Sequence, residues 1–465
     1  LGNNKIADSI VRGLVGETST VSNINRHVEQ KATTTSHKAY DVAILQQELN
    51  SQCEANLVVD NIAGPKTLNA CIMVRIGARG NITKLVQKEL VRRGHHVTVI
   101  TGNSESKHAP GRFNRDGIDV IYVNNLYNNS QTKMQKVWSF VKFIFQSISV
   151  AKKEKNVDLV YATSTPLTIG AVALALRALK GWRYVFEVRD LWPEFPIQVG
   201  AVKNPLLIWA LRKFEKRIYK CSEHVVALSP GMQEGVVKAG TPVGKTSMIP
   251  NMSKPDIFHP HEVDMEIVKR FGVDLNKFNV IHFGMLAVAN GLEYIVNAAL
   301  DLKNRGDNSI NFIFMGEGAM EPKLKEFCKE HNLNNVQFLG NHPVGVVAEV
   351  TNCCDASITS FKNLPILATN SPNKLFDSLS AGKPIIVNSA GWTKDMVEQQ
   401  NCGFYVNVEK PSELADKLLE YKDKKDLLEE WGRNARRLSV EVYDKAKLSA
   451  QVAEVLEKTF NNLMK

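Results

Sequence analysis

The 465 residues are too many for one hydrophobic core and predict two or three domains. Contents of 44% hydrophobic and 23% charged residues are those of a globular protein and exclude a disordered chain. The 58 Lys and Arg against 48 Asp and Glu give a net charge of +10, which favours phosphates or an anionic membrane as partners; because no motif for DNA or RNA binding occurs, we expect no nucleic acid partner.

Seven cysteines are spread along the chain without a Cys-x-x-Cys pair or a histidine at metal-ligand spacing. They predict reduced thiols in the core and no metal site. The sequence shows no run of 18 apolar residues and no signal peptide, so we expect a cytoplasmic location.

The first 40 residues predict a helix followed by a linker. Residues 1–16 predict a short amphipathic helix that ends at a glycine. Residues 17–40 are rich in Ser, Thr, Asn, Gln and His and predict a polar linker.

Residues 41–76 carry a compact helical pattern. Three apolar residues share one helix face and precede the turn sequence VDNIAGPKT of residues 59–67; they are Val42, Leu45 and Leu49. This pattern resembles the three-helix peptidoglycan-binding repeat of bacterial and phage cell-wall amidases, and residues 1–16 resemble the end of an amidase catalytic domain. The resemblance covers residues 1–83 and implies peptidoglycan as a partner of residues 41–76.

A second copy of the repeat opens at Val74 but is not completed, because its first helix runs into the helix and strand pattern QKELVRRGHHVTVITG. This change predicts a fusion of two unrelated proteins at a point of local similarity. Residues 71–76 are apolar enough to be the first strand of the second protein, and Gly77-Ala78-Arg79-Gly80 fits the loop after it. The same residues fit the end of the repeat equally well.

Strands then alternate with helices, which predicts a parallel sheet covered by helices. The predicted strands are His96–Thr101, Val120–Val123, Leu159–Ala162, Tyr184–Val188 and Val225–Leu228. Between Lys133 and Lys155 lies a helix with aromatic residues and a rim of lysines, which fits the surface of an anionic membrane. A core helix with a solvated basic face fits the same pattern.

Charged residues directly follow the strand that ends at Val188. Because the carboxyl ends of parallel strands face the ligand crevice, Asp190 in the sequence RDLWPE is a candidate catalytic residue. A surface loop with a buried Trp192 is the alternative.

A second α/β domain is predicted from the strand Asn279–Phe283, which leads into a turn at Gly284. Glycine there allows close approach to a phosphate. Two further strand-to-turn units follow at residues 312–318 and 336–342.

The sequence NSPNKLFDSLSAGKP, residues 370–384, predicts an anion-binding helix start. Ser371 is the candidate N-cap and Pro372 suits the first turn, so the helix is expected to begin at Asn373 and Lys374. Free backbone N–H groups and the helix dipole at such an end suit a diphosphate. Asp377, one turn later, is expected to be half-exposed on the face of Lys374, where it suits a ribose diol.

This segment resembles the donor-site signature of retaining glycosyltransferases of family 4, in the branch that builds bacterial capsule and O-antigen sugars. The resemblance covers residues 77–465 and implies the GT-B fold, an α/β architecture with two Rossmann-like domains. It assigns Asp377 to the ribose, whereas the family's first acid falls on Thr369. Many relatives carry a basic residue directly after the glycine that corresponds to Gly284 and a lysine shortly after it. This sequence has Met285 and Asn290 at those positions.

The resemblance also implies roles for other residues. Gly77 and Gly80 remain from the family's first glycine loop, and Asp190 matches the acid at the interdomain cleft. Asn341 and His342 fall near the nucleotide base, and Gly284, Met285, Ser371, Asn373 and Lys374 at the donor phosphates.

The predicted domains include a crossover helix that returns from the second Rossmann-like domain to the first. In order, they are an amidase-like tail 1–16, a linker 17–40, a peptidoglycan-binding-like repeat 41–76, an acceptor domain 77–260, a nucleotide-sugar domain 261–440 and the crossover helix 441–465.

The predicted function is transfer of a hexose or N-acetylaminosugar from a UDP-linked donor to a lipid-linked or oligosaccharide acceptor, without metal or other cofactor, on the inner face of the cell membrane. Two alternatives are a peptidoglycan-binding fusion with an inactive transferase and a GT-B nucleotide-sugar epimerase. Because the fusion replaces the first glycine loop, we expect impaired transfer.

Overall fold

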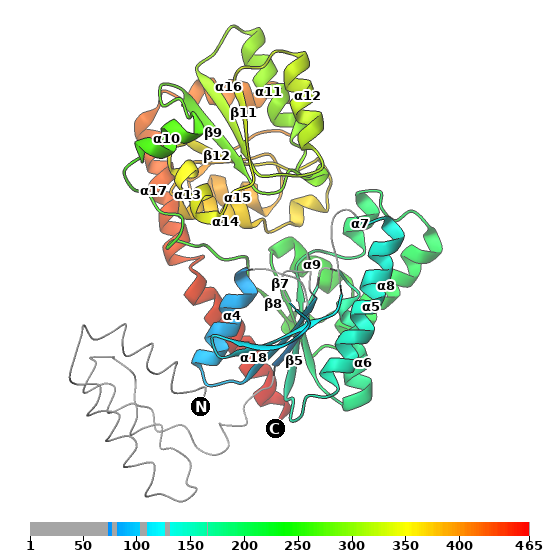
Figure 1. Cartoon of the computed structure of the whole chain (residues 1–465). Helices are drawn as coiled ribbons and strands as arrows, with labels where there is room; N and C mark the ends of the chain where they lie inside the picture. Colours follow the sequence, from blue (N-terminus) through cyan, green and yellow to red (C-terminus); the bar gives the residue numbers. More distant parts are fainter. Residues whose placement is uncertain (1–72, 77–80, 103–108, 126–130, 165, 465) are drawn as a thin grey trace, which may run out of the picture. The chain divides into compact units, whose positions relative to one another are not determined.

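The computed structural model describes residues 73–76, 81–102, 109–125, 131–164 and 166–464, which fold around two parallel sheets (Figure 1). The predictions for residues 1–16, for residues 17–40, for the repeat up to residue 72, and for Gly77 and Gly80 lie outside the described residues.

The first sheet has eight strands in the order β3-β4-β2-β1-β5-β6-β7-β8. They are β1 (Met73–Ile76), β2 (Val97–Gly102), β3 (Gly111–Arg115), β4 (Ile118–Val123), β5 (Leu159–Thr163), β6 (Tyr184–Val188), β7 (His224–Ala227) and β8 (Thr246–Met248). All pairs are parallel except β3 with β4. The five predicted strands are confirmed as β2, β4, β5, β6 and β7, and β3 is an edge strand that the sequence analysis missed.

Six helices connect these strands: α4 (Asn81–Arg92), α5 (Lys133–Ala151), α6 (Ile169–Lys180), α7 (Glu194–Gln198), α8 (Pro205–Cys221) and α9 (Pro230–Lys238). The apolar faces of these helices pack on the sheet. Strands such as β5, in which all of Leu159–Thr163 are buried, need helices on both faces of the sheet to cover them.

The strand β1 lies in the middle of the first sheet. Met73 pairs with Val97 of β2 on one side and with Leu159 of β5 on the other, and both ladders are parallel. This position corresponds to the first of the two readings of residues 71–76, a strand of the α/β domain. The sheet includes Met73–Ile76, which lie before the predicted start of the acceptor domain at residue 77.

The second sheet has six parallel strands in the order β11-β10-β9-β12-β13-β14. They are β9 (Phe278–Phe283), β10 (Ile310–Met315), β11 (Val336–Gly340), β12 (Ala356–Thr359), β13 (Ile385–Val387) and β14 (Gly403–Tyr405). Around it lie α10 (Met265–Phe271), α11 (Glu293–Asn304), α12 (Glu321–Glu330), α13 (Val344–Asn352), α14 (Asn373–Ser380), α15 (Trp392–Gln399), α16 (Pro411–Tyr421) and α17 (Lys425–Glu441).

Residues of β9 alternate between two apolar cores, because successive side chains of a strand point to opposite faces. Phe278 and Val280 pack into one core, and Ile281 and Phe283 into the other. His282 is the one imidazole in this strand and is only 1% exposed. It lies next to the carboxyl end of β9, one residue before Phe283.

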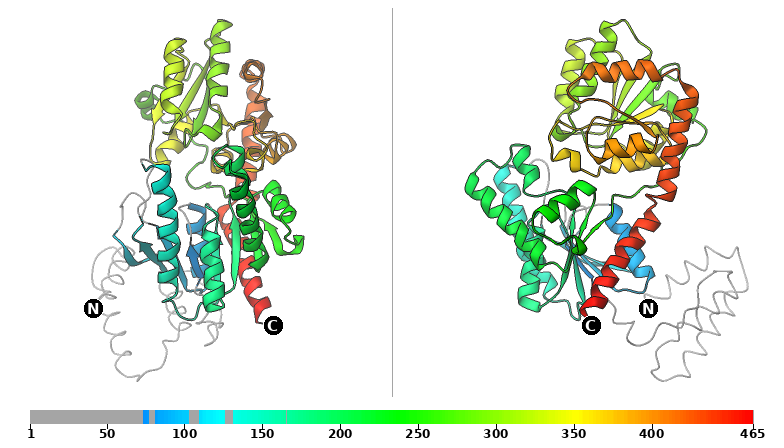
Figure 2. Two further views of the ribbon diagram at one scale, coloured as in Figure 1. Left: turned by 90° about the vertical axis from the view of Figure 1, so that its right-hand side faces the viewer. Right: turned by 180° about the vertical axis from the view of Figure 1, so that it is seen from behind.

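The chain ends with α18 (Lys445–Leu463), which packs against α4 (Figure 2). Leu448, Val452 and Leu456 share a core with Val86 and Leu90 of α4. This helix falls within the predicted crossover helix of residues 441–465, and it covers the first sheet.

We expect a chain that begins at Arg79 to be less stable than the whole chain, because β2 and β5 would lose their shared neighbour. The four residues of β1 carry backbone bonds worth about 1 kcal/mol each, so the melting temperature should fall by about 10 °C. Thermal melts followed by circular dichroism measure this. A chain that begins at Asn69 keeps β1 and is the control; equal melting of both truncations would show that β1 contributes nothing.

Candidate functional site

A pocket of about 470 Å³ opens at the carboxyl ends of strands from both sheets. Its walls are Arg189, Asp190, Leu228, Asn251, Phe283, Gly284, Met285, Ala287, Asn290, Phe361, Asn370, Ser371, Pro372, Asn373, Lys374 and Asp377. Seven of the residues predicted for the site therefore line one cavity: Asp190, Gly284, Met285, Ser371, Asn373, Lys374 and Asp377.

Lys374 stands in the first turn of α14 and reaches back to β9. Its Nζ lies 2.9 Å from Nε2 of His282, and Nδ1 of His282 lies 3.1 Å from the carbonyl oxygen of Ile358. Burial lowers the pKa of Lys374 to about 7. The sequence analysis missed His282; its only signal was a polar residue within an apolar strand.

The start of α14 is at Asn373, as predicted, but Ser371 is not its N-cap. Pro372 occupies the cap position, and no side chain caps the helix. The Ser371 hydroxyl instead accepts the backbone N–H of Asn251 at 3.3 Å, and its carbonyl oxygen accepts the Asn251 side-chain amide. Ser371 therefore lies one residue too far from the helix for capping, and it ties α14 to the segment after β8.

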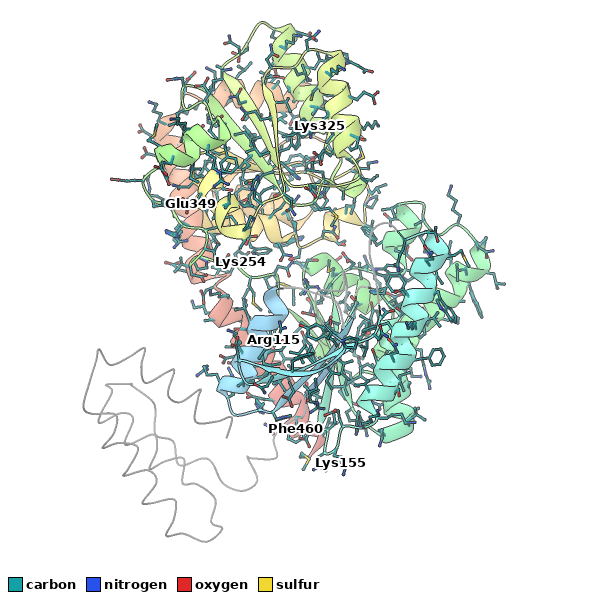
Figure 3. The ribbon with its side chains drawn as sticks, in the orientation of Figure 1. Arg115, Lys155, Lys254, Lys325, Glu349 and Phe460 are labelled. Atoms are coloured by element: carbon teal, nitrogen blue, oxygen red, sulfur yellow. The ribbon has the colours of Figure 1, made fainter. Side chains whose placement is uncertain are left out.

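Asp377 is 7% exposed, so the expectation of a half-exposed acid is wrong. Its carboxylate accepts two hydrogen bonds from Nζ of Lys254, at 2.8 and 3.0 Å. Burial raises the pKa of Asp377, and the neighbouring Lys254 opposes part of that rise. Figure 3 shows Lys254 on the segment that joins the two sheets.

The turn after β9 needs a glycine. Gly284 has φ +102°, a left-handed conformation that side chains disfavour, and a Cβ there would lie 3.8 Å from Nζ of Lys374. Neither of the next candidate positions supplies a charge, since Met285 is 66% exposed and Asn290 donates to the Met285 carbonyl oxygen at 2.6 Å. Lys374 is therefore the cation beside this turn.

Asp190 enters the pocket from the turn after β6, together with Arg189. The Arg189 backbone N–H donates to the Ser164 hydroxyl at 2.8 Å, and its guanidinium lies 3.9 Å from the buried carboxylate of Glu187. Arg189 is a second pocket cation that the sequence analysis did not name as a site residue. It faces the pocket from the first sheet, whereas Lys374 faces it from the second.

Asn341 and His342 do not line this pocket. They follow β11, and the His342 imidazole lies 2.9 Å from the Leu339 carbonyl oxygen and packs on the Phe271 ring. Their assignment to the nucleotide base stays a prediction.

Thr369 takes part in the contact between the two α/β units rather than in the pocket. Its carbonyl oxygen accepts the Ser229 hydroxyl, and its side-chain hydroxyl donates to the Ile366 carbonyl oxygen at 2.7 Å. A Cβ on Gly231 would lie 2.9 Å from the Thr369 methyl group, so this contact is tight. Thr369, on which the family's first acid falls, therefore does not line this pocket.

Among the described residues, no group of three His, Cys, Asp or Glu side chains is placed to hold a metal ion. In the same part of the chain, no helix is both long and apolar enough to cross a membrane.

We expect Lys254→Met to destabilise the fold by about 3 kcal/mol, because it leaves the Asp377 carboxylate buried without its cation. Urea denaturation followed by tryptophan fluorescence measures this. The double variant Lys254→Met/Asp377→Leu should recover most of the loss, since no charge is then buried. A double variant as unstable as the sum of both single variants would contradict the role of the pair.

Comparison with known proteins identifies two domains in the chain. Residues 80–252 match the glycosyl transferase 4-like domain family, and residues 264–438 match glycosyl transferases group 1. The probable glycosyltransferase WbjE of Pseudomonas aeruginosa is 22% identical over 252 residues, which are 53% of this chain and 61% of that protein. The chain thus spans less than two thirds of that relative's length.

Solved structures show the same fold at low identity. Sucrose-phosphate synthase from Thermosynechococcus elongatus is 15% identical with a TM-score of 0.69, over 84% of this chain and 99% of that one. HepE from Anabaena, solved in complex with UDP and glucose, is 18% identical with a TM-score of 0.63, over 83% of this chain and 99% of that one. With both domains matched and the fold shared, the chain is a glycosyltransferase of the GT-B type.

Proposed function

We propose that the chain transfers a sugar, with retention of anomeric configuration, from a UDP-linked donor to a lipid-linked or oligosaccharide acceptor of bacterial surface polysaccharide. The observation that carries this proposal is the pocket in which Lys374, the start of α14 and the Gly284 turn meet. Lys374 offers positive charge and the helix start offers backbone N–H groups, as a diphosphate requires. Gly284, whose own N–H donates to the Met315 carbonyl oxygen, leaves room for a phosphate to approach.

The donor side of the proposal rests on charge. A sugar diphosphate bond breaks with negative charge developing on the leaving phosphate, and fixed donors aimed at that charge stabilise the transition state. Lys374 and the free N–H groups at Asn373 are such donors. The complex of UDP and glucose with the Anabaena neighbour supports a uridine nucleotide here, and its fold is the fold of this chain.

Asp190 is the proposed catalytic residue. It lines the donor pocket from the opposite sheet, which is the side where an acceptor hydroxyl has to enter. A carboxylate there orients the hydroxyl or takes up its proton.

The acceptor side of the proposal rests on α5. Its outer face exposes Trp138 at 69% and Phe145 at 69%, beside the exposed Lys142. Large exposed aromatic residues next to lysines suit the surface of an anionic membrane, where a lipid-linked acceptor is held. On this basis we propose that the protein acts at the cytoplasmic face of the cell membrane.

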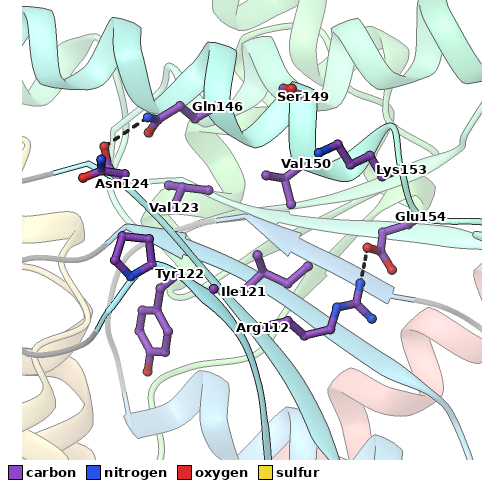
Figure 4. A pocket seen from close by; sticks show the side chains of 12 residues that line it. Arg112, Ile121, Tyr122, Val123, Asn124, Gln146, Ser149, Val150, Lys153 and Glu154 are labelled. Carbon is purple, nitrogen blue, oxygen red and sulfur yellow. Dashed lines mark hydrogen bonds and ion pairs between the residues drawn. The ribbon is translucent and has the colours of Figure 1, made fainter.

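A second pocket of about 560 Å³ lies beside the same helix, between α5 and the strands β3 and β4 (Figure 4). Ile121, Val123 and Val150 form apolar walls, and Arg112 and Glu154 pair at one end. A groove with apolar walls and a charged end suits part of a lipid-linked glycan. This supports an acceptor region on the first α/β unit.

The direct test is incubation of the protein with a panel of UDP-sugars and a lipid-linked acceptor, with product and anomeric configuration measured by NMR. We expect one sugar to be transferred with retention. Isomerised nucleotide sugar would instead indicate an epimerase, and no turnover with any donor would indicate an inactive transferase.

We expect Asp190→Asn to lower the transfer rate by about a hundredfold or more, because the amide accepts no proton. Binding of UDP, measured by calorimetry, should be unchanged. Asp423→Asn is the matched control, since that acid is 81% exposed in its side chain and lies outside the pocket. Equal loss in both variants, or none at Asp190, would exclude the catalytic role.

We expect Trp138→Ala/Phe145→Ala to weaken binding to phosphatidylglycerol vesicles by about tenfold per side chain, because each removes a large apolar surface from the lipid. A co-sedimentation assay measures this. Leu275→Ala, which changes an exposed apolar residue before β9, serves as control. If vesicle binding were the same in all three proteins, α5 would not be the membrane surface.

A further inference from the structure

We propose that His282 and Lys374 form a proton-coupled clamp for the donor diphosphate, in which Lys374 takes up one proton from solvent as the diphosphate binds. His282 positions the amine before and after this step. The inference rests on the proposed function for the nature of the ligand and on the geometry of the pocket for the rest.

The hydrogen-bond chain defines the tautomer of His282. Nδ1 of the ring is 3.1 Å from the Ile358 carbonyl oxygen, and a carbonyl oxygen only accepts, so Nδ1 carries the hydrogen. The neutral ring then presents a lone pair at Nε2, which is 2.9 Å from Nζ of Lys374. The amine must be the donor of that hydrogen bond.

This arrangement suits both states of the lysine. A charged amine has three N–H groups and a neutral amine has two, and either can donate one to Nε2 of His282. A doubly protonated His282 could not accept this bond and would repel a charged Lys374. Burial and the neighbouring Lys374 both lower the pKa of His282 well below its usual value, so Lys374 is the group that changes charge.

Among the described residues, the other charged groups around the pocket give Lys374 no counter-ion. Asp377, on the next turn of α14, has Lys254 as its partner at 2.8 Å. Arg189 and Asp190 line the pocket from the first sheet. Within the part of the chain that the structure describes, Lys374 forms no ion pair with a carboxylate, and its hydrogen-bond partner is the neutral His282.

A donor diphosphate supplies the missing negative charge. Because burial lowers the pKa of Lys374 to about 7, both forms of the amine are present at neutral pH in the free pocket. Two phosphate charges beside the amine raise its pKa again, so the proton and the donor each strengthen the binding of the other. Above pH 7, donor affinity should fall about tenfold per pH unit, because a proton must then be bound as well.

Calorimetric titration with UDP-glucose in two buffers of different ionisation enthalpy measures the protons taken up. UDP-glucose has no group that titrates between pH 6 and 8, so uptake reports the protein. We expect uptake close to one proton at pH 8, a small uptake at pH 6, and about tenfold weaker binding at pH 8. Binding without proton uptake at pH 8 would overturn the clamp.

Substitutions distinguish the role of Lys374 from the role of His282. Lys374→Arg keeps a cation that never loses its charge, so the variant should take up no proton and bind equally at both pH values. His282→Gln keeps an acceptor for the amine and should bind within a few fold of the parent, whereas His282→Leu should bind about tenfold more weakly. Lys383→Arg is the control, because Lys383 is also partly buried but donates to the Asn352 carbonyl oxygen outside this pocket. Proton uptake that persists in Lys374→Arg would overturn the assignment.

A measurement without nucleotide separates this inference from the proposed function. Competitive acetylation read by mass spectrometry gives the pH at which Lys374 titrates in the whole chain. We expect about 7 in the free protein instead of the ordinary 10.5, and a rise with inorganic diphosphate. An ordinary titration, or no response to any diphosphate, would overturn the clamp. A response to inorganic diphosphate but not to UDP-glucose would support the clamp and refute the UDP-sugar assignment.

Discussion

The buried ion pair between Lys254 and Asp377 is the interaction on which the geometry of the pocket around Lys374 depends. It joins the segment between the two sheets to the helix α14, which carries Lys374. Two charges taken out of water gain little net stability from each other, but neither can lose its partner without a large cost. The pair therefore holds α14 in one place more than it adds to overall stability. Arg436 supports the same segment, because its guanidinium donates to the carbonyl oxygens of Pro255 and Phe258.

Two residues from different sheets, Lys374 and Arg189, give the pocket positive charge. In the second sheet, Met285 and Asn290 add no positive charge beside the Gly284 turn, so Lys374 and the helix start carry that role. Arg189 adds a second cation from the first sheet. Arg189 and Lys374 thus line one pocket from the two sheets.

The central strand β1 of the first sheet is short and needs no special residues to pair with its neighbours. Four residues, Met73–Ile76, pair on both sides with β2 and β5. A parallel strand is held by backbone hydrogen bonds and by apolar residues of ordinary kinds, so many short apolar segments satisfy it. A short segment such as Met73–Ile76 can therefore complete the sheet through its backbone.

The amino-acid sequence alone determined the two parallel sheets, most strand positions, the helix start at Asn373, the turn at Gly284 and the pocket position of Asp190, Lys374 and Asp377. These follow from local patterns of apolar periodicity, glycine and proline, which act over a few residues. Only the tertiary structure decided which side chains pair with each other in the pocket. Lys254 and Asp377 are 123 positions apart, and His282 and Lys374 are 92 apart, so no local pattern joins them. For the same reason the prediction of Ser371 as an N-cap is wrong. The local sequence around a serine before a helix is the same whether its hydroxyl caps that helix or accepts a hydrogen bond from Asn251, 120 positions away.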